Sequence, residues 1–225
     1  MEILSIYSSI NCVLLLYIVV STQNIVKIEK EVVHIDNLIL LVGKSGSGKT
    51  TIANYCEKEF WMKQVQSYTT RKTRFKGEKG HTFITMAEYM KLPDKVATTY
   101  FDGNYYCATQ QQCEDADIYV IDPHGLESFK RNYHGNKNWI TVYIDVNPFT
   151  RFHRMVKRGD SIFAALERLK HDHHAFKNFK KRNNMVIVKN KDVTAVSKMI
   201  DSLCKMERLN MVDLVKKVGI KRVRQ

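Results

Sequence analysis

The sequence lacks the cysteine spacing that marks a zinc site or a disulfide framework. Its five cysteines are scattered and include no Cys-x-x-Cys pair: Cys12, Cys56, Cys107, Cys113 and Cys204. It also lacks an internal repeat and has few acids, with 23 Asp and Glu against 36 Lys and Arg, so the net charge is +13 at pH 7. This charge suits a polyanionic ligand, and nucleotides and nucleic acids both qualify. A length of 225 residues, 44% of them hydrophobic, indicates one globular α/β domain with terminal extensions.

The N-terminal segment lacks the features of a signal peptide. Residues 3–20 are mostly apolar and about long enough to span a bilayer. They carry no basic n-region and no small-x-small cleavage site, and three serines and Asn11 dilute the run as a membrane span. We expect residues 1–37 to be a leader or a loosely packed extension that the domain does not need. A membrane anchor at residues 3–20 is the alternative.

A glycine-rich octapeptide is the most informative motif. Residues 43–50 read Gly-Lys-Ser-Gly-Ser-Gly-Lys-Thr and match the phosphate-binding P-loop pattern G-x-x-x-x-G-K-[ST]. The apolar run 38–42 precedes them, and a helical pattern at 51–60 follows, which is the strand–loop–helix context that the motif requires. In such a loop, successive backbone N–H groups surround phosphate oxygens, and the helix N-terminus adds partial positive charge.

The loop predicts a site for ATP and Mg²⁺. We expect Lys49 to reach the β- and γ-phosphates and the Thr50 hydroxyl to help hold Mg²⁺. Asp122 ends the apolar run 117–121 and is placed to hold the same ion through water. The residues predicted to bind ATP are Gly43, Lys44, Ser45, Gly46, Ser47, Gly48, Lys49, Thr50 and Thr51.

The rest of the chain alternates between strand and helix patterns. Strands are expected at 38–42, 65–70, 97–101, 105–108, 117–121, 139–146 and 185–188, and helices at 51–60, 86–92, 110–116, 148–157, 161–179 and 193–205. This order predicts an α/β fold with a mostly parallel central sheet and helices on both faces. The expected domain is 38–205. Residues 206–225 form a basic tail that we interpret as a solvated amphipathic helix rather than a nucleic-acid or lipid-binding segment.

A second set of motifs resembles the guanylate kinase family of nucleoside monophosphate kinases. Residues 67–74 read Ser-Tyr-Thr-Thr-Arg-Lys-Thr-Arg and precede Gly77-Glu78, similar to the family's S-x-T-T-R-x-x-R and G-E. Residues 103–109 resemble its G-x-x-Y-G-[ST], and residues 121–125 its strand-D-x-x-G. Three further arginines match those of the family's lid: Arg154, Arg158 and Arg168. The resemblance covers about residues 38–204 and lies in the order and spacing of the motifs.

The resemblance implies a P-loop three-layer sandwich with an acceptor-nucleotide-binding insertion and a helical lid. It implies transfer of the ATP γ-phosphoryl group to a nucleoside monophosphate in the cytoplasm, with Lys49 and the three lid arginines as catalytic residues. Two arginines three positions apart on a loop can hold a phosphate bidentately. The implied acceptor-binding residues are Ser67, Arg71, Arg74, His81, Tyr106 and Thr109.

The chain departs from the family where the base is read. The family's acid, hydroxyl and second acid are replaced by Ala97, Ala108 and Val120, and His81 is the nearest equivalent of the tyrosine after the G-E pair. Unpaired donors of guanine would cost about 1–3 kcal/mol per buried group. We therefore expect relaxed or shifted base choice, extending to a pyrimidine or a modified deoxynucleotide, with GMP or dGMP the best single candidate. The alternative is that carboxylates come from a realigned loop: Asp102, Asp94 or Glu88.

Other functions remain open at this point. A catalytically silent guanylate kinase-like interaction module is disfavoured by the complete P-loop, and a nucleic-acid-associated P-loop ATPase is suggested by charge alone. The expected partners are small-molecule nucleotides, with no obligate protein partner. His171, His173 and His174 with Asp172 are interpreted as a solvated helix face, because successive helix positions cannot all face one metal ion.

Overall fold

The computed structural model describes residues 37–73, 76–78, 80–179, 185–190 and 192–205. They belong to a compact unit that extends from Ile35 to Gln225, and the other unit, Met1–His34, lies outside the described residues. Residues 1–36 of the expected leader, its alternative as an anchor and the helix expected within 206–225 also lie outside them. Asn37 was wrongly included in the leader, because it is buried and donates from Nδ2 to the carbonyl oxygens of Leu203 and Cys204 at 3.1 and 3.3 Å. None of the helices described is both long and apolar enough to cross a membrane.

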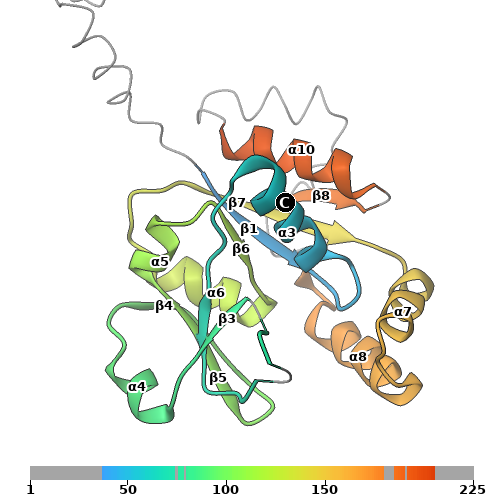
Figure 1. The fold of residues 1–225 in the computed structure, drawn as a ribbon, viewed down its shortest axis with the longest axis horizontal. Coiled ribbons are helices and arrows are strands. Elements are labelled where there is room, and N and C mark those ends of the chain that lie inside the picture. The colour runs from blue at the N-terminus through green and yellow to red at the C-terminus, as the bar shows by residue number, and fades with distance from the viewer. Residues whose placement is uncertain (1–36, 74–75, 79, 180–184, 191, 206–225) are drawn as a thin grey trace, which may run out of the picture. The chain divides into compact units, whose positions relative to one another are not determined.

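The central sheet contains four parallel strands in the order β6-β1-β7-β8 (Figure 1). They are β6 (Ile118–Val120), β1 (Leu38–Gly43), β7 (Trp139–Asp145) and β8 (Val186–Lys189). Strands β1 and β7 pair in register from Leu38 with Trp139 to Gly43 with Ile144. Every residue of β1 is buried, as a parallel strand covered on both faces requires.

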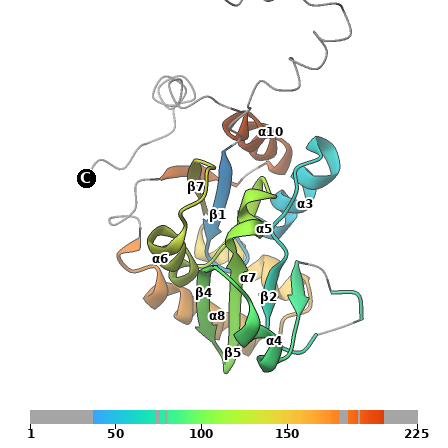
Figure 2. The same ribbon diagram turned by 90° about the vertical axis from the view of Figure 1, so that its left-hand side faces the viewer.

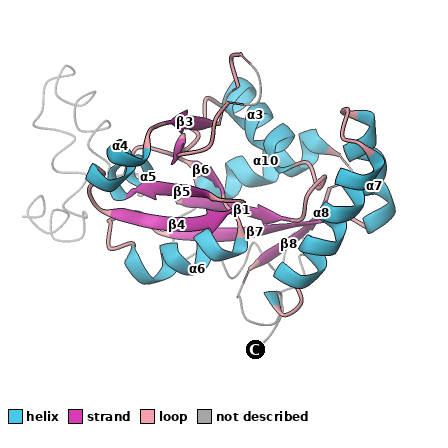
Figure 3. Cartoon of the chain, turned by 90° about the horizontal axis from the view of Figure 1, so that it is seen from below, coloured by secondary structure: helices cyan, strands magenta, loops and turns pink. Residues whose placement is uncertain are grey.

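Helices form a layer on each face of this sheet (Figure 3). Side chains of β1 alternate between two apolar clusters. On one face Leu40 shares a cluster with Leu126 and Phe129 of α6 (Pro123–Asn132). On the other, Leu41 shares one with residues of α3 (Lys49–Phe60) and α10 (Val193–Cys204). The predicted three-layer α/β sandwich is confirmed.

A second sheet has the order β3-β2-β5-β4 (Figure 2). Its strands are β3 (His81–Phe83), β2 (Ser67–Thr69), β5 (Asn104–Thr109) and β4 (Lys95–Phe101), with the short helices α4 (Met86–Lys91) and α5 (Gln110–Glu114). Strand β4 is antiparallel to β5, and the turn between them uses Asp102 and Gly103 with φ of 49° and 74°. The predicted hairpin is confirmed, whereas β3 and α6 were not predicted.

Helix α6 also covers the outer edge of β4. The buried Ser128 hydroxyl accepts a hydrogen bond from the Thr98 N–H at 3.0 Å and donates to the Val96 carbonyl at 3.2 Å. One side chain of α6 therefore satisfies two backbone groups of the strand.

Two helices follow β7 and carry the expected lid arginines. They are α7 (Pro148–Lys157) and α8 (Ile162–Ala175), separated by the predicted break at 158–160. Asn147 and Ser161 accept N–H bonds at their N-termini, which fixes where each helix starts. Helix α8 ends at Ala175, so the expected extension to residue 179 was wrong.

Candidate active site

The P-loop lies between β1 and α3, and its glycines are required by close neighbours. Gly46 and Gly48 have φ of 73° and 94°, in the region that favours glycine. A Cβ on Gly46 would lie 2.7 Å from the Arg151 carbonyl oxygen, and one on Gly48 would collide with Nδ2 of Asn190. The loop is therefore packed against residues from two distant parts of the chain.

Lys49 points back into the loop that precedes it. Its Nζ donates to the carbonyl oxygens of Gly43 at 2.6 Å and Lys44 at 3.3 Å, which uses two of the three ammonium N–H groups. Burial lowers the pKa of Lys49 to about 8, an effect that the Asp172 carboxylate opposes and the Arg151 charge reinforces. Lys49 is therefore mostly a cation at neutral pH.

The two residues expected at a metal ion present oxygen atoms. Thr50 is exposed in the first turn of α3, and Asp122 is exposed just after β6. The Asp122 carboxylate is oriented by the N–H groups of His124 and Gly125 at 2.8 and 3.0 Å and by the Thr99 hydroxyl at 2.9 Å. A hydroxyl and a carboxylate are the oxygen donors that Mg²⁺ prefers, so this set fits the ion.

The three lid arginines occupy two places. Arg154 donates to the carbonyl oxygens of Ser47 and Asn190, each at 3.3 Å, so it lies against the P-loop. Arg158 and Arg168 instead converge on Asp160, at 2.7 and 3.8 Å. Their side chains are 50% and 41% exposed, which leaves both guanidinium groups accessible from solvent.

A buried ion pair beside the P-loop was missed from the sequence. Arg151 of α7 and Asp172 of α8 are 2% and 5% exposed, and Nη1 lies 2.7 Å from Oδ2. The interpretation of Asp172 as part of a solvated face was therefore wrong, although His171, His173 and His174 are exposed. The available signal was a charged residue on the apolar face of each helix, in line with the buried Met155 on α7 and Ala165 on α8.

Asn190 is a second missed residue. It follows β8 directly, is buried, and donates from Nδ2 to the Ser47 carbonyl at 2.9 Å. Its signal was the same as that of Asp122, because polar residues at the carboxyl ends of parallel strands gather at the ligand-binding edge of the sheet.

Four of the predicted acceptor-binding residues lie together on the second sheet. Ser67 Oγ is 2.8 Å from Nδ1 of His81, and the His81 and Tyr106 rings are 5.8 Å apart. Arg71 donates from both terminal nitrogens to Glu78, at 3.2 and 2.8 Å, and the Tyr106 hydroxyl acts on the same guanidinium. The motif therefore builds one polar cluster from strands β2, β3 and β5.

The structure shows no such role for the two other predicted acceptor residues, for a different reason in each case. Arg74 lies outside the described residues. Thr109 is buried at the N-terminus of α5, where its hydroxyl accepts the Gln112 N–H at 3.3 Å. In the structure Thr109 thus stabilises a helix start.

The positions expected to read the base are apolar and mostly buried. Ala97 and Ala108 pair across β4 and β5 and are 2% and 0% exposed. The buried Tyr119 reaches the Ser67 hydroxyl, which acts against the rise that burial causes in the Tyr119 pKa. The alternative carboxylates lie elsewhere. The Glu88 carboxylate accepts the Thr85 N–H at 2.7 Å at the start of α4, and Asp102 is exposed in the β4–β5 turn.

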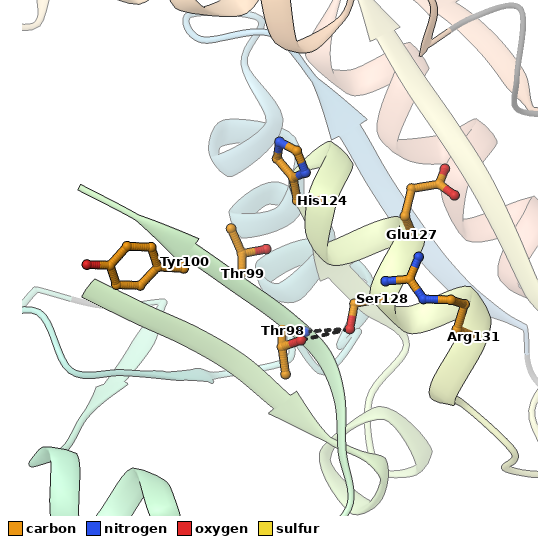
Figure 4. A pocket seen from close by; sticks show the side chains of 7 residues that line it. All are labelled: Thr98, Thr99, Tyr100, His124, Glu127, Ser128 and Arg131. Atoms are coloured by element: carbon orange, nitrogen blue, oxygen red, sulfur yellow. Dashed lines mark hydrogen bonds between the residues drawn. The ribbon is translucent and has the colours of Figure 1, made fainter. Parts of the chain in front are cut away.

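A cavity of about 560 Å³ opens between β4 and α6, beside Asp122 (Figure 4). It is lined by Thr98, Thr99, Tyr100, His124, Glu127, Ser128 and Arg131. Thr99 and the backbone of His124 both hydrogen-bond Asp122, so the cavity and the proposed metal-holding carboxylate share a wall.

Comparison with known proteins shows what this chain is similar to. A family model described as "AAA domain" matches residues 39–170, more than half of the chain. A guanylate kinase of Mycoplasmopsis pulmonis (strain UAB CTIP) is 28% identical over 144 residues, which cover 56% of this chain and 73% of that protein. The crystal structure of guanylate kinase from Anaplasma phagocytophilum superposes with a TM-score of 0.51 and 18% identity, covering 80% of this chain and 95% of that one. This structural match shows the fold.

Proposed function

Because the chain belongs to the P-loop family that the AAA-domain model describes and is guanylate kinase-like, we propose that it is a cytosolic nucleoside monophosphate kinase. It transfers the γ-phosphoryl group of Mg·ATP to the α-phosphate of a nucleoside or deoxynucleoside monophosphate. The observation that carries the proposal is the presence, on two sheets of one compact unit, of a complete P-loop and of the Ser67–His81–Arg71–Tyr106 cluster.

On the donor side, the P-loop amides and Lys49 hold the triphosphate. Bound Mg²⁺, held by Thr50 and through water by Asp122, would neutralise phosphate charge. Arg154 already lies at the loop, whereas Arg158 and Arg168 are accessible and share Asp160 as a partner. We expect these two to move onto the transferring group, where charge stabilisation is most effective in a water-excluded site.

On the acceptor side, Arg71 binds the α-phosphate, with Arg74 and Tyr106 assisting. Glu78 and the Lys72 carbonyl hold the Arg71 guanidinium in one orientation, which fixes the direction of its other N–H donors. Ser67 and His81 face the base. Since Ala97 and Ala108 provide no acceptor for guanine's N–H groups, we propose that guanine is not strongly preferred, although GMP or dGMP remains the best single candidate.

The experiment is ADP release with Mg·ATP and a panel of GMP, dGMP, dTMP, dCMP and AMP. We expect ADP release that depends on the acceptor. We expect kcat/KM for GMP to lie within about 10³-fold of the value for the best of the other monophosphates. A preference for GMP above about 10³-fold would show that the base site is misread. ATP binding without phosphorylation of any acceptor would overturn the kinase, and salt-dependent DNA binding in that protein would favour a nucleic-acid-associated ATPase.

A further inference from the structure

The ion pair between α7 and α8 contacts every polar group of one P-loop residue. Asp172 Oδ2 accepts the Ser45 N–H at 2.9 Å, and Oδ1 accepts the Ser45 hydroxyl at 3.3 Å. Arg151 Nη1 donates to the Ser45 carbonyl at 3.2 Å and to Asp172 at 2.7 Å. Ser45 is thus held by its amide, its carbonyl and its side chain, from two helices more than a hundred residues later in the sequence.

These contacts continue along the loop. Two residues after Ser45, the Ser47 carbonyl accepts from Arg154 at 3.3 Å and from Asn190 at 2.9 Å. In a trans peptide the carbonyl and the next N–H point in opposite directions, and the described chain contains no cis peptide. Because Arg151 holds the Ser45 carbonyl and Arg154 holds the Ser47 carbonyl, the N–H groups of Gly46 and Gly48 are directed away from these arginines.

Stability alone is a weak reason for such a pair. Removing two charges from water costs several kcal/mol per ion, and apolar residues of similar volume are often equally stable or more stable. What apolar residues would not supply is hydrogen bonds to Ser45. The pair is therefore suited to specify the conformation of the loop.

We propose that Arg151 and Asp172 are positioning residues that hold the P-loop in the form that presents the Gly46 and Gly48 amides to the triphosphate. The inference rests on the proposed function for its ligand, a nucleoside triphosphate. Since α7 also carries Arg154 and is followed directly by Arg158, and α8 carries Arg168, the same pair ties the loop to the segment that supplies the lid arginines.

The test compares Arg151→Met/Asp172→Leu, an apolar replacement of the pair, with Asp172→Asn and wild type. The matched control is Lys137→Met, which breaks another partly buried pair, with Asp117 at 3.6 Å, far along the chain from the loop. We expect the double variant to fold with a Tm close to that of wild type and to bind Mg·ATP in the absence of acceptor at least about tenfold more weakly. Lys137→Met should keep the wild-type Kd.

A second readout does not depend on nucleotide. In protein labelled with ¹⁵N-glycine, the amide chemical shifts of Gly46 and Gly48 should change in Arg151→Met/Asp172→Leu and in Asp172→Asn. They should stay unchanged in Lys137→Met. If a folded double variant keeps the wild-type Kd for Mg·ATP and the wild-type glycine resonances, the positioning role is refuted. If no acceptor in the panel is phosphorylated, the proposed kinase activity is refuted. The positioning role of Arg151 and Asp172 is still tested in that case by the glycine chemical shifts and the Kd for Mg·ATP.

Discussion

The donor and acceptor halves of the molecule obtain their polar groups in different ways. Around the P-loop, the predicted ligands are consecutive residues, and charged side chains from α7 and α8 hold the loop from outside. At the second sheet, single residues from β2, β3 and β5 and Arg71 from the loop after β2 form the cluster. A site built from consecutive backbone amides depends on loop conformation, whereas a site built from separate side chains depends on which residues occupy a few positions. The second kind can change its ligand by single substitutions.

The largest difference between the donor and acceptor halves is expected from Lys49→Ala. Removal of the ammonium takes charge from the transferring phosphoryl group, so kcat should fall by about 10³-fold or more while the KM for the acceptor changes little. The measurement is steady-state kinetics together with a thermal melt. Lys58→Ala, in the same helix but exposed and paired with Glu59, is the control and should retain full activity. Normal turnover by folded Lys49→Ala would remove the P-loop from the chemistry.

Arg71→Ala tests the acceptor half. Loss of a charge-assisted contact to the α-phosphate should raise the KM for the monophosphate about 10- to 100-fold, equivalent to about 1.5–3 kcal/mol, with the KM for ATP unchanged. Glu78 would lose its partner, so stability should also fall, and Arg71→Lys separates the two effects by keeping a charge beside Glu78. Lys72→Ala, at the exposed neighbour, is the control. An equal rise in both KM values would contradict the division into two sites.

The pH dependence should also differ between the halves. A lysine whose pKa is lowered to about 8 is charged below that pH and neutral above it. Since the charged form binds phosphate, kcat/KM for Mg·ATP should decline by about tenfold per unit above pH 8. The acceptor arginines stay charged throughout, so kcat/KM for the monophosphate at saturating ATP should change less. A flat ATP profile to pH 10 would show that Lys49 charge does not limit donor binding.

The smallest effect is expected from removal of the N-terminal segment. A chain that starts at Asp36 should keep both sites, because every residue assigned to them lies beyond it. Its Tm should stay within about 2–4 °C of the full chain, the shift that about 1 kcal/mol produces at this size. Aggregation or loss of activity after the truncation would place part of residues 1–35 in the packed domain.

The position and the glycine conformations of residues 43–50 could be predicted from the sequence because the P-loop pattern is local. Its glycines are demanded by backbone conformation, and its position after a buried strand follows from apolar periodicity. The mostly parallel central sheet and the hairpin followed from the same patterns, whereas the order of the strands was not predicted. Arg151 and Asp172 were missed because Ser45, which both of them contact, lies more than a hundred residues away in the sequence. A charged residue on a helix also indicates a solvent-exposed position unless the apolar face of the helix is identified first. Helix α6 was missed because no helix was expected between the strands at 117–121 and 139–146, although a proline such as Pro123 often occupies the first position of a helix.

Ser128 also affects whether two copies of this protein can associate through β4. An edge strand normally presents a row of unpaired backbone N–H and C=O groups, with which a strand of another molecule can pair. On β4 the serine hydroxyl uses the groups of Val96 and Thr98, so helix α6 blocks strand addition along that stretch with one side chain. A Ser128→Ala protein would leave the Thr98 N–H and the Val96 carbonyl without this partner while adding no bulk to the buried site. At high protein concentration, self-association through β4 is the first defect expected of this variant, before any loss of the proposed activity.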